Sequence, residues 1–308
     1  MIKNQKFGVE IEMTGITRAK AAKLVAEVLE SRASAPSADC YRTRKIKDQS
    51  GREWKVMRDG SISASINDGT SQSIDEYSVE FVTPPLNYED IELLQKIVRK
   101  LRENGAKANS SCGIHIHIDG ANHTPDSLKR LINFMIARQD LVYEALEIKN
   151  RGNRWCRKLN KDLLKEMKAC RNLSKSEAEQ IWYSSANDGY SSGIDHHHYN
   201  PTRYHGVNLH SYFSKGTVEF RLFNSTLHAG KIKAYIQFCL AVSAWAITDT
   251  SKVIFRSMDG YTAEQKVTIM RNILTHRLGL YGNEFKTCRF HLMTPLKKAA
   301  GMVCRNVA

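Results

Sequence analysis

The segment Gly113–Asp119, with the sequence GIHIHID, alternates between apolar and titratable residues without a break. Its three isoleucines occupy alternate positions, and two histidines and an aspartate (His115, His117 and Asp119) occupy the others. Because successive side chains of a β-strand point to opposite faces, the pattern predicts a strand with an apolar back and a titratable front. Such a front suits a metal ion or an anionic phosphate. The alternative is an ordinary exposed strand face, although these more often carry Thr, Lys or Glu.

Three other segments repeat this design, with apolar residues alternating with charged ones. They are FGVEIEM at 7–13, YSVEFVT at 77–83 and TVEFRLF at 217–223. Their charged residues are Glu10 and Glu12, then Glu80, then Glu219 and Arg221. If the four strands lie in one sheet, their fronts form one surface lined by carboxylates, imidazoles and a guanidinium. Clustered carboxylates repel one another unless cations neutralise them, and Mg²⁺ or Mn²⁺ with oxygen ligands would do so.

The composition describes a protein able to bury a sizeable core. The chain has 308 residues, 42% of them hydrophobic, and no run of 18 apolar residues that would predict a membrane span. The first residues run directly into a predicted strand without the apolar region of a secretory signal. The seven cysteines include no Cys-x-x-Cys pair, which argues against a disulfide framework or a cysteine zinc site. We therefore expect a cytoplasmic protein without a membrane partner.

The formal net charge of +14 suggests an acidic or polyanionic partner. Part of the excess is local, because ten Lys or Arg residues lie between Lys149 and Lys175 against only Asp162 and Glu166. The alternative interpretation is a solvated helical surface. Without stacking aromatic residues or a nucleic-acid motif, the charge does not single out DNA or RNA.

The order of the predicted elements indicates one α+β domain. Strands are expected at 6–14, 41–57, 77–83, 112–119, 204–211 and 217–223, with the last two joined as a hairpin by Phe213–Gly216. Helices are expected after Thr17, at 88–103, 125–148, within 149–175, at 174–184, 228–248, 262–277 and 281–300. We place a catalytic domain at 1–250 and a helical extension packed on it at 251–308.

Three further features lie outside the strand fronts. Asp59 precedes a glycine, and Asp-Gly is a strong turn signal, so a structural role competes with a catalytic one. Residues 63–76, rich in Ser, Asp and Gly, predict a mobile loop. The run His196–His198 invites a metal site, but the rings of three consecutive residues diverge, which favours a flexible lid.

Five motifs occur in an order typical of a known family. They are GVEIE at 8–12, DGS at 59–61, VEFVTP at 79–84, CGIHIH at 112–117 and TVEFR at 217–221. Together they resemble the amidoligase family of the carboxylate–amine ligase superfamily, which also contains glutamine synthetase and glutamate–cysteine ligase. The resemblance covers residues 7–226, about two thirds of the chain.

The resemblance implies a fold and a reaction. The fold is a curved antiparallel sheet with a concave active-site face and helices on its back, similar to the catalytic domain of glutamine synthetase. The concave face would hold ATP and two or three Mg²⁺ ions, with Mn²⁺ as a substitute. A substrate carboxylate would attack the γ-phosphate to give an acyl phosphate, and an amine would then displace phosphate to form an amide. The resemblance names neither the carboxylate nor the amine.

Residue roles follow by position in the motifs. The resemblance implies that Glu10, Glu12, Glu80 and Glu219 bind metal. Arg221 resembles the residue that grips the phosphoryl group or substrate carboxylate, with Glu219 beside it in catalysis. His115 and His117 resemble contacts to the nucleotide phosphates or to metal, and we add Asn208 as a nucleotide contact, because its amide is expected on the front of Glu219. Asp59 resembles a carboxylate that binds metal or deprotonates the incoming ammonium.

Two other functions remain open from the sequence. One is a metallohydrolase that uses His115, His117 and Asp119 around a zinc or manganese water. The other is a basic binding protein without enzymatic activity, in which the charged fronts are structural. Arg221 two residues after Glu219 favours phosphate chemistry over zinc hydrolysis, and the presence of all four front-face glutamates argues against a non-enzymatic protein.

Overall fold

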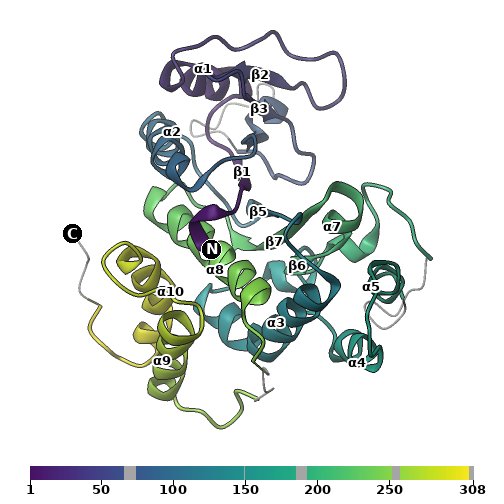
Figure 1. The fold of residues 1–308 in the computed structure, drawn as a ribbon. Helices are drawn as coiled ribbons and strands as arrows, with labels where there is room; N and C mark the ends of the chain where they lie inside the picture. The colour runs from purple at the N-terminus through teal and green to yellow at the C-terminus, as the bar shows by residue number, and fades with distance from the viewer. Residues whose placement is uncertain (66–73, 149, 185–192, 252–256, 305–308) are drawn as a thin grey trace. The chain divides into compact units, whose positions relative to one another are not determined.

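The computed structural model describes residues 1–65, 74–148, 150–184, 193–251 and 257–304 (Figure 1). The chain forms two compact units. Unit 1 contains Met1–Gln5, His117–Leu222 and Gln237–Ala308, and unit 2 contains Lys6–Ile116 and Phe223–Ile236.

Seven strands form a sheet in the order β2-β3-β4-β1-β5-β7-β6. Strands β1 and β4, β2 and β3, β3 and β4, and β6 and β7 pair antiparallel. With the helices described below, this confirms the predicted α+β class and antiparallel sheet. The curvature of the sheet and its likeness to glutamine synthetase stay predictions.

Unit 2 contains most of the sheet. Its elements are β1 (Phe7–Met13), α1 (Arg18–Val28), β2 (Arg44–Lys47), β3 (Glu53–Met57), η2 (Ile74–Tyr77), β4 (Val79–Val82), η3 (Tyr88–Asp90), α2 (Ile91–Glu103), the start of β5 (Gly113–Asp119), the end of β7 (Thr217–Asn224) and the start of α8 (Ala229–Thr248). Helix α1 begins as predicted at Thr17, whose hydroxyl accepts the Lys20 N–H at 3.2 Å. It packs on α2 and on strands β2 and β3 (Figure 1).

Unit 1 is mainly helical. Its elements are η1 (Ile2–Asn4), the end of β5, α3 (Pro125–Ala145), η4 (Asn150–Asn153), α4 (Lys161–Ala169), α5 (Lys175–Trp182), η5 (Pro201–Arg203), β6 (Val207–Asn208), α7 (His210–Lys215), most of β7 (Thr217–Asn224), the end of α8 (Ala229–Thr248), α9 (Ala263–Asn272), the π-helical η6 (Ile273–Arg277) and α10 (Lys286–Ala299). Ser174 and Glu177 form the predicted capping box of α5. Helix α10 packs on α9 and α3 (Figure 1).

The predicted hairpin of residues 204–223 is wrong in its first half. Within the described segment 204–211, strand pairing with β7 is limited to Val207 and Asn208, and the chain then enters the short helix α7. The expected turn Phe213–Gly216 ends this helix, where Gly216 adopts a left-handed conformation with a φ of 78°. Lysine in the last turn followed by glycine suits a helix end as well as a hairpin, and only the packing decides between them.

The apolar backs of the strands form the core that the alternation predicts. Ile114, Ile116 and Ile118 of β5 are fully buried, as are Ile11 of β1 and Phe81 of β4. Among the helices that the structure describes, none combines the length and apolar character needed to cross a membrane.

Candidate functional site

Strands β1 and β4 place two glutamates side by side in unit 2. The antiparallel register sets Glu12 directly opposite Glu80, and Glu10 opposite Val82. Residues directly opposite in such a pair project from the same face, so the front that the alternation predicts on each strand becomes one shared front. Glu10 and Glu12 lie on this front because they are two residues apart on one strand.

His115 joins Glu12 and Glu80 to form a buried cluster. Glu12 and His115 are each 3% exposed, and Glu80 is 8% exposed. One ligand atom from each of the three lies within 4.8 Å of the others. The backbone N–H of Gly113 donates to Glu12 Oε2 at 2.6 Å, so the start of β5 orients this carboxylate. The cluster therefore offers convergent oxygen and nitrogen donors to a cation.

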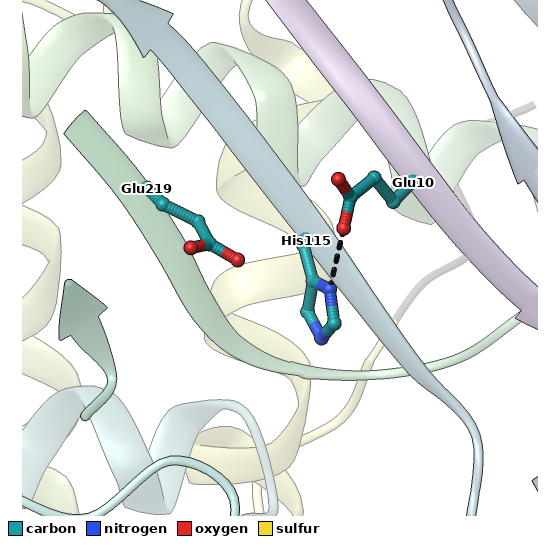
Figure 2. Close-up of side chains that lie close together, drawn as sticks. All are labelled: Glu10, His115 and Glu219. Atoms are coloured by element: carbon teal, nitrogen blue, oxygen red, sulfur yellow. Dashed lines mark hydrogen bonds and ion pairs between the residues drawn. The ribbon is translucent and has the colours of Figure 1, made fainter. Parts of the chain in front are cut away.

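Glu10 contacts the Nδ1 side of the His115 imidazole, and Glu12 lies near its Nε2 side. Glu10 Oε2 lies 2.8 Å from His115 Nδ1 (Figure 2), and His115 Nε2 lies 3.6 Å from Glu12 Oε1. The imidazole thus lies between two carboxylates of β1. Neighbouring carboxylates of this kind fix the orientation of a ring that serves as a ligand or a donor.

Unit 1 holds a second cluster around Glu219 of β7, which Figure 2 also labels. Arg221 Nη1 lies 2.6 Å from Glu219 Oε1, and Asn208 Nδ2 donates to Glu219 Oε2 at 2.5 Å. Asn208 faces Glu219 directly in the register of β6 and β7, as expected. Glu219 and Arg221 are 3% and 4% exposed, so this is a buried ion pair. The arginine also lies 5.8 Å from the ring of Tyr204.

His117 is oriented by hydroxyl groups in unit 1. Its Nδ1 lies 2.9 Å from the hydroxyl of Thr217, which in turn lies 2.8 Å from the hydroxyl of Ser211. Its Nε2 lies 3.8 Å from Glu219 Oε1. His115 and His117 therefore share a strand face but have different partners: carboxylates for the first, hydroxyls and Glu219 for the second.

The two predicted carboxylates outside these clusters hold turns. Asp59 Oδ1 accepts the backbone N–H of Ser61 at 2.6 Å, and Asp119 Oδ1 accepts that of Ala121 at 3.0 Å. Each is the local bond expected of an aspartate in a turn. The geometry thus shows the structural role considered for Asp59, while its catalytic role stays a prediction.

The histidine run at 196–198 does not converge. His196 Nε2 bonds to Glu179 Oε1 at 2.6 Å, His197 Nδ1 accepts the Tyr199 N–H at 3.3 Å, and the carbonyl of His198 accepts from Arg203 at 2.7 Å. Within the described ranges, the groups with metal-binding geometry do not include them. Most of the predicted loop at 63–76 lies outside the described residues, at 66–73.

The sequence interpretation missed three contributors to these clusters. Thr217 follows the alternation of Glu219 and Arg221 and was detectable from it. Ser211 was not, because it was expected to end the strand 204–211, whereas it lies in helix α7. The backbone N–H of Gly113 was not detectable either, since it depends on how β5 pairs.

The fold and its clusters define a class: an α+β protein with buried acid, imidazole and guanidinium groups on strand fronts. A family described as "Putative amidoligase enzyme" matches residues 3–243. The chain belongs to this family, as the sequence motifs predict, and the family supports a ligase activity. No curated protein matches the sequence.

Proposed function

We propose that the protein is an ATP-dependent carboxylate–amine ligase that uses Mg²⁺ and an acyl phosphate intermediate. The observation that carries the proposal is the buried cluster of Glu12, Glu80 and His115 in a chain of the amidoligase family. Buried carboxylates in direct register repel one another, and a divalent cation between them removes the repulsion.

The donor set of the unit 2 cluster fits a hard cation. Mg²⁺ prefers oxygen ligands and usually binds through one or two carboxylates together with substrate phosphates. Glu12 and Glu80 would hold such an ion within unit 2. The metal-binding roles of Glu10 and Glu219 stay predictions. When bound, Mg²⁺ supplies neutralising charge to the phosphates of ATP.

The remaining residues would bind and orient the reacting groups. Arg221, fixed by Glu219, presents a planar donor able to hold two oxygens of a phosphoryl or carboxylate group. His117 and His115 would donate to phosphate oxygens, the former steadied by Thr217 and the latter by Glu10. Glu219 therefore has a positioning role toward Arg221 in addition to its proposed role as a metal ligand.

The proposed reaction has two balanced steps. A carboxylate oxygen of the substrate bonds to the γ-phosphorus as the bond to the ADP oxygen breaks. The nitrogen of a neutral amine then bonds to the acyl carbon, phosphate leaves with the electrons of the carbon–oxygen bond, and the nitrogen gives up a proton. Both steps spread negative charge on phosphate oxygens, where preorganised cationic groups act most strongly.

Glu80→Gln tests the metal site directly. We expect Mn²⁺ or Mg²⁺ with ADP to raise the melting temperature of the unchanged protein, because a ligand that binds only the folded state stabilises it. The increase should be much smaller in Glu80→Gln, which removes one oxygen ligand charge at nearly constant volume. Glu76→Gln, the same change at an exposed residue of η2, is the matched control. An equal shift in all three proteins would exclude Glu80 from the site.

One observation keeps a metal-dependent hydrolase as a second candidate. A histidine combined with carboxylates also suits catalytic zinc, and His115 lies within the unit 2 cluster. The structure favours Glu12 and Glu80 as its co-ligands over the predicted Asp119, which holds a turn. Zinc-dependent hydrolysis of an ester or amide, without a melting shift by Mg²⁺ and ADP, would support this function over the ligase.

A further inference from the structure

A small pocket within unit 1 opens beside the Glu219 cluster. Its volume is about 160 Å³, and residues of 196–219 line it, among them Arg203, Asn208, Lys215 and Glu219. Sites for drug-sized ligands usually enclose about 300 Å³ or more. The pocket is thus too small for a nucleotide and suits a group the size of one amino acid.

Two cations line this pocket without a carboxylate partner. Among the described residues, neither Arg203 nor Lys215 has an acidic group within ion-pair distance; Arg203 donates to the carbonyl of His198 instead. The positive charges of Arg203 and Lys215 act on His210, which also lines the pocket. The pKa of His210 is lowered to about 4; burial is the largest cause, and Arg203 and Lys215 act in the same direction. His196 and Lys215 repel a proton on His210 as Arg203 does, and Glu219 attracts one. An anionic ligand group at Arg203 and Lys215 would be attracted.

The buried part of the pocket lining favours a hydrogen-bond donor of the ligand rather than an anionic group. Asn208 is 1% exposed, and its Nδ2 is committed to Glu219. Its Oδ1 is buried and accepts no hydrogen bond from the described residues. A buried acceptor without a donor is costly, so a ligand N–H at this position would be stabilised. Glu219 is also an acceptor, and each carboxylate oxygen can accept more than one bond. An anionic group at this depth would be repelled.

We propose that this pocket binds the amine substrate and that this substrate is an amino acid, with its ammonium at Asn208 and Glu219 and its carboxylate at Arg203 and Lys215. The proposal rests on the ligase function above and names its nucleophile. Before attack the ammonium loses one proton, and after attack the nitrogen loses a second to give the neutral amide. Free ammonia or a simple amine would leave the two cations unused.

Three probes with related carbon skeletons test the proposal by calorimetric titration. L-Alanine carries both charges, ethylamine lacks its carboxylate, and propionate lacks its ammonium. We expect L-alanine to bind at least tenfold more tightly than either. Propionate binding as tightly as L-alanine would instead show a simple anion site. Ethylamine binding as tightly would show an amine site without carboxylate recognition, and absence of L-alanine binding would overturn the proposal.

Lys215→Gln locates the binding site. Lys215 is exposed at the end of α7, so the variant is expected to fold. L-Alanine affinity should fall about tenfold or more, while the melting shift by Mg²⁺ and ADP stays unchanged. Lys165→Gln, at an exposed lysine of α4, should leave both unchanged. Equal affinity in Lys215→Gln and the unchanged protein would overturn the assignment.

These results separate this inference from the proposed function. If Mg²⁺ and ADP do not stabilise the protein but L-alanine binds in a Lys215-dependent way, the ligase proposal fails and the pocket is an amino-acid site of another activity. If the nucleotide binds and L-alanine does not, the ligase proposal stands and the amino-acid nucleophile is wrong.

Discussion

Several residues in this protein have a structural role as well as a proposed catalytic one. Arg221 is the clearest example, because its ion pair with Glu219 is compatible with either role. It is buried and ion-paired with Glu219 at 2.6 Å, which is what a purely structural arginine would do. Removing one partner of a buried pair commonly costs about 3–5 kcal/mol, because the other charge is left buried alone. A test of catalysis must therefore preserve the charge.

Arg221→Lys preserves the charge but loses the planar fork. We expect turnover to fall by about two to three orders of magnitude, as for loss of one preorganised group that stabilises developing charge. The melting temperature should change little, because a lysine ammonium can still pair with Glu219. ADP release in the presence of an amine and a candidate carboxylate, measured beside a melting curve, checks both expectations.

Arg52→Lys is the matched control for this change. Arg52 is ion-paired through two nitrogens with Asp90, at 2.8 and 3.1 Å, and belongs to neither cluster. Its substitution should lower stability and spare turnover. If Arg221→Lys behaves in the same way, with full activity per folded molecule, Arg221 is structural.

At the scale of elements, the corner between α7 and β7 determines how His117 is held. Ser211 comes from α7 and Thr217 from β7, and the two hydroxyls meet only because the chain reverses at Gly216. The Gly120 N–H, just after β5, donates to the Gly216 carbonyl at 2.9 Å. Two glycines thus join β5, α7 and β7 within unit 1.

The two glycines should respond differently to alanine. A Cβ at Gly120 would lie 2.5 Å from the Gly216 carbonyl oxygen and 2.7 Å from the ring of Tyr212, so backbone must move. We expect Gly120→Ala to lower the free energy of unfolding by about 2 kcal/mol or more, as overpacking does. Gly216→Ala has open space but a φ of 78°, and should cost about 1 kcal/mol. Denaturant titration measures both.

Gly282→Ala provides the reference for backbone strain alone. Gly282 has a φ of 77° with open space around it and lies far along the chain, after η6. It should match Gly216→Ala in stability. Equal costs at all three glycines would contradict the close approach of residue 120 to α7.

At the scale of the whole molecule, a buried polar network makes stability depend on pH. His123 Nδ1 lies 2.9 Å from the Ser127 hydroxyl, and its Nε2 lies 2.9 Å from the Ser243 hydroxyl, which donates to Gln5. The network joins the N-terminal segment, α3 and α8 within unit 1. Burial lowers the pKa of His123 to about 4, with Arg130 acting in the same direction and Asp119 against it.

This lowered pKa predicts a loss of stability in mild acid. Between pH 6.5 and 4, His123 binds a proton in the unfolded chain but stays neutral in the folded protein. The contribution of neutral His123 to the free energy of unfolding is therefore complete above pH 6.5 and decreases as the pH falls toward 4. The loss from this residue should approach about 3 kcal/mol at the acid end. Buried His210, with its pKa also lowered to about 4, should add to the effect. Melting curves from pH 7 to pH 4 measure the sum.

His123→Gln isolates the contribution of one residue. The variant should be less stable at pH 7, because an amide cannot reach both hydroxyls in the same way, yet its melting temperature should depend less on pH. The arginine-paired Asp75 does not interfere in this range. Its hydrogen bond with Arg58 lowers the pKa of Asp75, so the stabilisation from this pair is lost only as the pH falls below about 4. Parallel pH profiles for the variant and the unchanged protein would remove His123 as the cause.

Local patterns in the sequence were enough to predict most of the elements. Alternation in 7–13, 77–83, 113–119 and 217–223 predicted the four strands with charged fronts, because side-chain direction in a strand depends only on residue parity. Caps at Thr17 and Ser174 predicted two helix starts, because a cap needs only residues three positions apart. The same local rules failed at Phe213–Gly216, where one sequence fits either a hairpin turn or a helix end.

The sequence by itself thus determined which side chains share a strand front and to which family the chain belongs. Only the tertiary structure decided that Glu12 faces Glu80, that Arg221 and Asn208 both bind Glu219, and that Arg203 and Lys215 line one pocket with Asn208. Parity along a strand is a local property of the backbone. Register between strands and convergence of distant segments depend on how the apolar backs pack together, and that packing involves the whole chain at once.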